Sequence, residues 1–167
     1  MKEIKILFVC LGNICRSPAA EGVMSSFIKD EGLDELIAVD SAGTLDYHIG
    51  EGADPRMKVH SKKRGYDLTS ISRQFDPQKD FDEFDYIVTM DNSNYRSIKK
   101  LDTGKIHEDK IFKMAKFIEN YKVNEVPDPY YEGPEGFEYV LNLIEDGCRH
   151  LLNKVKNEIK QSNKIGD

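Results

Sequence analysis

Ile4–Pro18 reads IKILFVCLGNICRSP, an apolar run that passes through a short loop into a helix start. The first half of this segment lacks the polar alternation of a half-exposed strand, which predicts a strand that is buried on both faces. Gly12 and Asn13 permit a tight turn with positive φ. Ser17 and Pro18 are typical of a helix N-cap and the first helical position. The segment therefore predicts a strand, a loop and a helix in direct succession.

The rest of the chain repeats this alternation of strands and helices. Further apolar runs predict buried strands at Ile37–Val39, Tyr86–Met90 and Ile111–Met114. Asp54 and Pro55 again mark a helix start, and this helix is expected to end at Gly65. A continuous apolar stripe over Phe137–Ile159 predicts a long last helix. Strands alternating with helices indicate an α/β sandwich around a parallel sheet, in which ligands bind beyond the carboxyl ends of the strands.

Length and charge narrow the class of protein. The chain has 167 residues, which predicts one domain, expected over residues 1–160 and followed by a polar tail, 161–167, that frays. Lys and Arg number 24 against 30 Asp and Glu, a net charge of −6, so neither nucleic acid nor a membrane surface is an expected partner. The run from Ile4 to Cys10 is interrupted by Lys5 and is too short to span a membrane. Three cysteines favour reduced thiols in the cytoplasm over a disulfide framework.

Cys10 ends the first predicted strand, and five residues separate it from Arg16. The loop between them can turn successive backbone N–H groups inward, and the helix adds the positive potential of its N-terminus, which predicts an anion cradle. Arg16 would bind two phosphate oxygens with its planar guanidinium group. The same groups favour the thiolate of Cys10, a nucleophile for phosphorus, and Ser17 can donate a hydrogen bond to its sulfur. The alternative is a buried strand cysteine beside an ordinary turn.

A cysteine nucleophile that expels an oxygen leaving group needs a general acid, which later acts as a base on water. Asp128 is the candidate, because it lies in Val126–Tyr131, VPDPYY, where two prolines stiffen a loop. An aspartate in a rigid turn is the alternative interpretation. Tyr130 and Tyr131 favour a site, since adjacent tyrosines on a loop are costly to expose unless they border a pocket or an interface.

Val9–Pro18 together with the sequence DPYY at residues 128–131 resembles the low-molecular-weight protein tyrosine phosphatases. Val39–Thr44 and Phe84–Asp91 support the resemblance, which covers nearly the whole chain. It implies a three-layer α/β sandwich with a central four-stranded parallel sheet flanked by helices and a phosphate-binding loop after the first strand. It also implies hydrolysis of phosphotyrosine through a phosphocysteine intermediate, without a metal or organic cofactor. The implied partners are phosphotyrosine-containing proteins, with inorganic phosphate or other oxyanions as ligands, and the chain is expected to be a monomer or weak dimer.

By residue, the resemblance implies that Cys10 is the nucleophile, Arg16 the phosphate clamp and Asp128 the general acid. The other residues expected in the phosphate-binding loop or at the substrate are Leu11, Gly12, Asn13, Ile14, Cys15, Ser17, Tyr47, Tyr130 and Tyr131. Relatives that act on phosphoarginine carry threonine at the position of Ile14, so this apolar side chain favours a phenyl ring. Many members have a histidine that supports the loop through its asparagine, and Ser70 at that position predicts weaker or rearranged support.

The remaining cysteines and histidines have separate interpretations. Cys15 could capture a sulfenic acid at Cys10 as a disulfide and so protect the nucleophile, and a small packed residue is the alternative. Cys148 lies on the apolar stripe of the last helix and is expected in the core. The four histidines lack metal-ligand spacing, so no metal site is predicted. The alternative functions are a phosphoarginine phosphatase, a non-catalytic phosphate-binding module and a thiol-dependent arsenate reductase. The last of these would need two further cysteines in a mobile segment.

Overall fold

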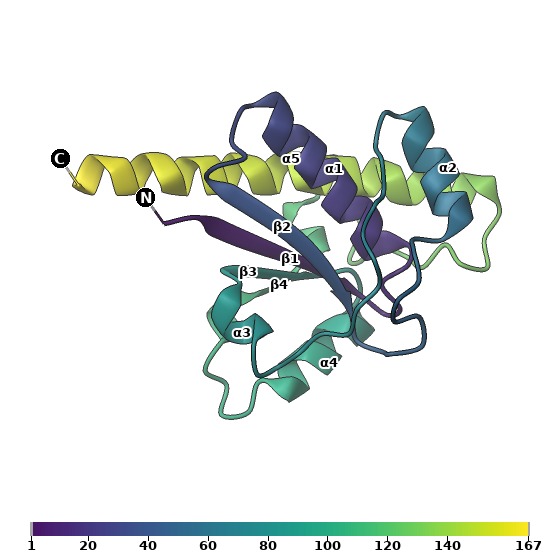
Figure 1. The fold of residues 1–167 in the computed structure, drawn as a ribbon, viewed down its shortest axis with the longest axis horizontal. Coiled ribbons are helices and arrows are strands. Elements are labelled where there is room, and N and C mark those ends of the chain that lie inside the picture. The colour runs from purple at the N-terminus through teal and green to yellow at the C-terminus, as the bar shows by residue number, and fades with distance from the viewer. Residues whose placement is uncertain (1, 167) are drawn as a thin grey trace.

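The structure, a computed structural model, describes residues 2–166 and places four parallel strands in one sheet (Figure 1). The strands are β1 (Ile4–Cys10), β2 (Ile37–Gly43), β3 (Tyr86–Thr89) and β4 (Ile111–Lys113). Their order across the sheet is β2-β1-β3-β4. The register of β1 and β2 runs from Ile4 opposite Ile37 to Cys10 opposite Gly43. All four predicted strands are confirmed, and β2 continues beyond its predicted end at Val39.

Helices cover both faces of the sheet, so the predicted three-layer fold is confirmed. Figure 1 shows α1 (Arg16–Asp30), α2 (Pro55–Lys63) and α5 (Pro134–Ile165) on one side and α3 (Asp80–Glu83) and α4 (Asn92–Leu101) on the other. Two 3-10 turns, η1 (Glu108–Lys110) and η2 (Met114–Phe117), flank β4. Helices α3 and α4 have no counterpart among the predicted elements.

The core lies on both sides of β1, as its continuous apolar sequence requires. Ile6 and Phe8 belong to the apolar cluster that includes α1 and α5, whereas Leu7 and Val9 belong to the cluster beside α3 and α4. All four side chains are 0% exposed. Alternate side chains of a strand point to opposite faces, so β1 anchors both layers at once. Its carboxyl end is therefore held firmly in place.

The two predicted helix starts have different outcomes. Asp54 caps α2, because its carboxylate accepts a hydrogen bond of 2.8 Å from the Arg56 N–H, and α2 ends just before Gly65, whose φ is +89°. The prediction that Ser17 caps α1 is wrong. Cys15 holds the cap position, and the Ser17 hydroxyl is turned inward to other partners, so α1 starts earlier than the Ser-Pro signal predicts.

Helix α5 contains the predicted apolar stripe and continues to Ile165, into the segment 161–167 that the sequence predicts to fray. Residues 160–166 are exposed, and the helix there projects beyond the sheet (Figure 1). Of the helices within residues 2–166, none combines the length and the apolar character that crossing a membrane requires.

The strand order also fixes where a site can form. The chain passes from β1 to the edge strand β2 and returns to β3 on the other side of β1, so the segments after β1 and β3 diverge. Open parallel sheets bind ligands in the crevice at such a point, beyond the carboxyl ends of the strands. Cys10, the last residue of β1, lies there.

Candidate active site

Residues 11–15 form a tight loop between β1 and α1, called the phosphate loop below. Four carbonyl groups at this turn accept hydrogen bonds from groups outside the turn. The pairs are Thr44 N–H to Cys10 O, Leu45 N–H to Leu11 O, Ser72 Oγ to Gly12 O and Asp54 N–H to Ile14 O. In a trans peptide the N–H points away from the carbonyl of the same plane. These contacts therefore turn the loop amides toward its centre, which is the arrangement of an anion cradle.

Asn13 fixes the loop from within. Its φ is +57°, in the left-handed region, and its side chain is buried. The Arg73 N–H donates to Asn13 Oδ1 at 3.0 Å, so the Asn13 amide nitrogen faces the other way and donates to Ser17 Oγ at 2.8 Å and to Ser41 Oγ at 2.9 Å. Ser17 Oγ lies 3.0 Å from Cys10 Sγ. Because Ser17 already accepts a hydrogen from Asn13, its own hydrogen can point at the sulfur.

Arg16, the first residue of α1, is 2% exposed and is held by groups from distant segments. Its Nη1 donates to Asp91 Oδ2 at 2.6 Å and to the carbonyl of Val126 at 3.0 Å. Its Nη2 lies 3.5 Å from Asp128 Oδ2. Burial lowers the pKa of Arg16, but the negative charges of Cys10, Asp91 and Asp128 outweigh burial and raise it above its ordinary value. The guanidinium is thus charged and rigidly oriented.

Asp128 lies on the segment that crosses the mouth of the site. Its side chain is 43% exposed, and its Oδ1 accepts a hydrogen bond of 3.0 Å from the Tyr130 N–H. Arg56 at the start of α2 donates to the Tyr130 carbonyl at 3.0 Å and stacks over the Tyr130 ring, with its Cζ 5.2 Å from the ring centroid. Asp54 in turn binds the Arg56 guanidinium. The Asp128 segment is therefore fastened to α2.

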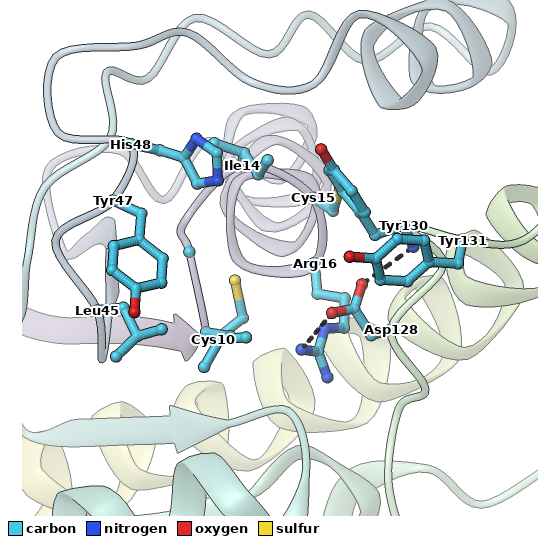
Figure 2. Close-up of a pocket in the computed structure, with 12 residues that line it drawn as sticks. Cys10, Ile14, Cys15, Arg16, Leu45, Tyr47, His48, Asp128, Tyr130 and Tyr131 are labelled. Atoms are coloured by element: carbon cyan, nitrogen blue, oxygen red, sulfur yellow. Dashed lines mark hydrogen bonds and ion pairs between the residues drawn. The ribbon is translucent and has the colours of Figure 1, made fainter.

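A pocket of about 280 Å³ opens over Cys10, and Figure 2 shows the side chains around it. Tyr47 and His48 border one side, and Tyr130 and Tyr131 border the other, with the two tyrosine rings edge to face and their centroids 4.9 Å apart. Tyr131 is 94% exposed, so its ring stands at the rim. Of the residues expected from the sequence, the pocket brings together Cys10, Leu11, Gly12, Ile14, Cys15, Arg16, Tyr47, Asp128, Tyr130 and Tyr131.

Cys15 also borders the pocket, but its chemistry differs from that expected of a nucleophile. The residue is 4% exposed. Burial raises the pKa of the Cys15 thiol, and the nearby charges of Asp54, Cys10 and Asp128 raise it further. Cys15 is therefore a protonated thiol near neutral pH. Cys148 is 0% exposed in the core, as expected.

The expected support at Ser70 is rearranged. Ser70 lies beside Glu21, and Asn13 is held by Ser41 and by the backbone N–H of Arg73. Ser72 adds a contact to the loop carbonyl of Gly12. The loop thus keeps its support through a different set of groups.

Several residues of the site have no place among the predictions. Leu45 and His48 border the pocket, and their closeness to Tyr47 in the sequence is the feature from which they could be predicted. Asp91, which binds Arg16, follows β3 and caps α4 in a capping box with Asn94. The three-residue spacing of that capping box is visible in the sequence. Arg56 has no such signal, because only the folded chain brings α2 to the Asp128 segment.

Comparison with known proteins identifies the family. Residues 5–162 match the family described as low molecular weight phosphotyrosine protein phosphatase. A Synechocystis protein assigned to the low molecular weight protein-tyrosine-phosphatases is 48% identical, over 93% of this chain and 99% of that one. The human low molecular weight phosphotyrosine protein phosphatase is 39% identical, over 89% of this chain and 94% of its own. A crystal structure of the protein tyrosine phosphatase from Entamoeba histolytica with Hepes in the active site has a TM-score of 0.90 at 48% identity, over 93% of this chain and 99% of that one. This chain therefore belongs to the low molecular weight phosphotyrosine protein phosphatases, a family of phosphoric monoester hydrolases.

Proposed function

We propose that this protein hydrolyses phosphotyrosine in protein substrates through a phosphocysteine intermediate. The observation that carries the proposal is that Asp128, more than a hundred residues away in the chain, borders the same pocket as Cys10 and Arg16. Arg16 also contacts the Asp128 carboxylate, so the three groups can act on a single phosphate. The family assignment supports the same reaction class.

In the first step the Cys10 thiolate attacks phosphorus opposite the phenolic oxygen. The sulfur–phosphorus bond forms as the phosphorus–oxygen bond breaks, and the Asp128 carboxyl gives its proton to the leaving oxygen, so that tyrosine leaves as a neutral phenol. Arg16 and the inward amides of the phosphate loop bind the three non-bridging oxygens, where charge is spread in the transition state.

In the second step the Asp128 carboxylate takes a proton from water, and the oxygen of that water attacks phosphorus. The sulfur–phosphorus bond breaks and Cys10 leaves as a thiolate, to which the Ser17 hydroxyl can donate. Inorganic phosphate is released, and Asp128 is again protonated. The two steps balance without an electron donor, and the proposed cytoplasmic location would keep the free thiol of Cys10 reduced.

The walls of the pocket support an aromatic substrate. Leu11 and Ile14 are apolar, and the rings of Tyr47 and Tyr131 stand at the rim on opposite sides (Figure 2). Each edge or offset contact with a phenyl ring is worth about 0.5 to 1.5 kcal/mol beyond the area that it buries. Ile14, in place of a threonine, offers no hydroxyl to a guanidino group, which favours phosphotyrosine over phosphoarginine.

The test is hydrolysis of an aryl phosphate and a phosphotyrosine peptide, with and without a chelator, by the wild type and by Cys10→Ser. We expect chelator-resistant turnover in the wild type, none in the variant, and binding of inorganic phosphate by both. Turnover by Cys10→Ser near the wild-type rate would refute the nucleophile. Faster hydrolysis of a phosphoarginine peptide would reassign the substrate, and thioredoxin-coupled release of arsenite would reassign the reaction to arsenate reduction.

A further inference from the structure

Glu21 lies on α1 one turn after Ser17, outside the residues that border the active-site pocket. Its Oε2 accepts a hydrogen bond of 3.2 Å from Ser41 Oγ, and Ser70 and the carboxylate of Asp40 also lie close to it. Its side chain borders a separate cavity of about 150 Å³, which is also lined by Asp67. The carboxylate therefore reaches the reacting groups only through other side chains.

The donors and acceptors along this path have a fixed direction. Asn13 Oδ1 is occupied by the Arg73 N–H, so both hydrogens of the Asn13 amide nitrogen are available to Ser17 and Ser41, at 2.8 and 2.9 Å. A hydroxyl has one hydrogen, and each of these serines already accepts from Asn13. Each must therefore donate elsewhere. Ser17 can donate to Cys10 Sγ, 3.0 Å away, in preference to the longer contact with the Ala42 carbonyl at 3.4 Å, and Ser41 donates to Glu21.

Glu21, which accepts the last hydrogen bond of this path, determines whether the Asn13 and Ser41 hydrogen bonds keep their direction. If Glu21 did not accept the Ser41 hydrogen, that hydroxyl would gain by donating back to the Asn13 side chain. The amide would then turn its oxygen toward the serines, since its two ends have nearly the same shape. Ser17 could donate to that oxygen instead of to the sulfur of Cys10. The Arg73 N–H alone would oppose the turn.

We propose that Glu21 is a positioning residue for the phosphatase reaction, on which this inference rests. By accepting the Ser41 hydrogen, it keeps the Asn13 amide donating to both serines and so keeps the Ser17 hydroxyl directed at Cys10. The hydrogen bond from Ser17 then stabilises the thiolate before attack and again as the sulfur leaves phosphorus. Glu21 touches none of the reacting atoms and acts through Ser41 and Asn13.

Two substitutions at this position separate the acceptor from the charge and the shape. Glu21→Gln keeps an oxygen acceptor, whereas Glu21→Met keeps the length and removes the acceptor. We expect Glu21→Met to lower kcat for an aryl phosphate by about tenfold, which corresponds to about 1.4 kcal/mol in the barrier, and to change KM much less. Glu21→Gln should restore most of the activity. Recovery in the uncharged Glu21→Gln excludes a general charge effect, and Asp67→Asn, which removes an exposed carboxylate from the same cavity, should match the wild type.

A double-mutant cycle with Ser41→Ala tests the path itself. If Glu21 acts through Ser41, adding Glu21→Met to Ser41→Ala should cost no further activity. The rate at which iodoacetate alkylates Cys10 should fall in Glu21→Met and recover in Glu21→Gln, while thermal unfolding shows both variants folded.

Several results would overturn the inference, and each is distinct from failure of the proposed function. They are equal activity of Glu21→Gln and Glu21→Met, wild-type activity in Glu21→Met, or additive losses in the cycle. Absence of aryl phosphate hydrolysis by the wild type would instead refute the proposed function. The alkylation rates of Cys10 would still decide the role of Glu21 in that case.

Discussion

Gly43 is the last residue of β2 and lies against the phosphate loop. Gly43→Ala therefore tests whether this contact sets the position of the loop. A Cβ at this position would lie 2.9 Å from the carbonyl oxygen of Leu11 and 3.1 Å from both Asn13 N and Gly12 C. Ordinary contacts of a Cβ are 3.4–4 Å. All three neighbours are backbone atoms, so no flexible side chain can swing away. Either the loop or the end of β2 must move by a few tenths of an ångström.

The size of the effect follows from this overlap. Forcing one methyl group into a well-packed site costs about 1–3 kcal/mol of stability. The loop cannot drift freely, because the backbone N–H groups of Thr44 and Leu45 bind its Cys10 and Leu11 carbonyls at 2.9 Å. A misplacement of about 1 Å can cost about a hundredfold in rate, so a shift of a third to a half of that distance corresponds to about fivefold to tenfold in kcat/KM. Inhibition by inorganic phosphate should weaken in parallel, because the loop amides bind both ligands.

The assay is kcat/KM for an aryl phosphate, with the inhibition constant of phosphate and the free energy of unfolding measured on the same preparations. Gly52→Ala is the matched control, because a Cβ there would meet only the end of the Lys58 side chain, 3.0 Å away at Nζ. That flexible chain can move, so this variant should match the wild type. Wild-type kcat/KM and phosphate inhibition in Gly43→Ala would refute the claim that this contact sets the position of the loop.

Three further predictions concern the acid, its support and the second cysteine. Asp128→Asn should slow esters of poorly acidic phenols by about a hundredfold or more and esters of acidic phenols much less; an equal loss across a series of leaving groups would remove Asp128 from the acid role. Arg56→Ala, which frees the Tyr130 carbonyl and ring, should reproduce a weaker form of that leaving-group dependence, whereas a uniform change in KM alone would contradict a link to the acid. Because burial raises the pKa of Cys15, iodoacetate near neutral pH should label Cys10 first. Inactivation by peroxide should be reversible by thiols in the wild type but not in Cys15→Ala. Recovery of activity in both proteins would rule out a protecting disulfide.

How much of this site the sequence predicts depends on how local each part is. The phosphate loop is predictable because Cys10, Asn13 and Arg16 lie within one strand–loop–helix unit whose turn and spacing are visible in the chain. The prediction that Ser17 caps α1 is wrong because a serine before proline looks the same in the sequence whether its hydroxyl caps the helix or binds other groups. Neighbours such as Asp91 could not be placed, since the strand order alone brings the end of β3 beside the end of β1.

The charge balance of the pocket connects binding to the acid step. The protein has a net charge of −6, and Arg16 already faces the carboxylates of Asp91 and Asp128, so a phosphate dianion does not enter a field of excess cationic side chains. The attraction for the phosphate must therefore come from the Arg16 guanidinium and the inward amides of the phosphate loop together. Asp91 binds Nη1 from behind, whereas Asp128 lies against Nη2, on the pocket side. A phosphate that binds Nη2 therefore lies next to the Asp128 carboxyl group. The guanidinium nitrogen that can bind the phosphate and the carboxyl group proposed as the acid thus lie together on the pocket side of Arg16, so that one buried arginine connects binding to the acid step.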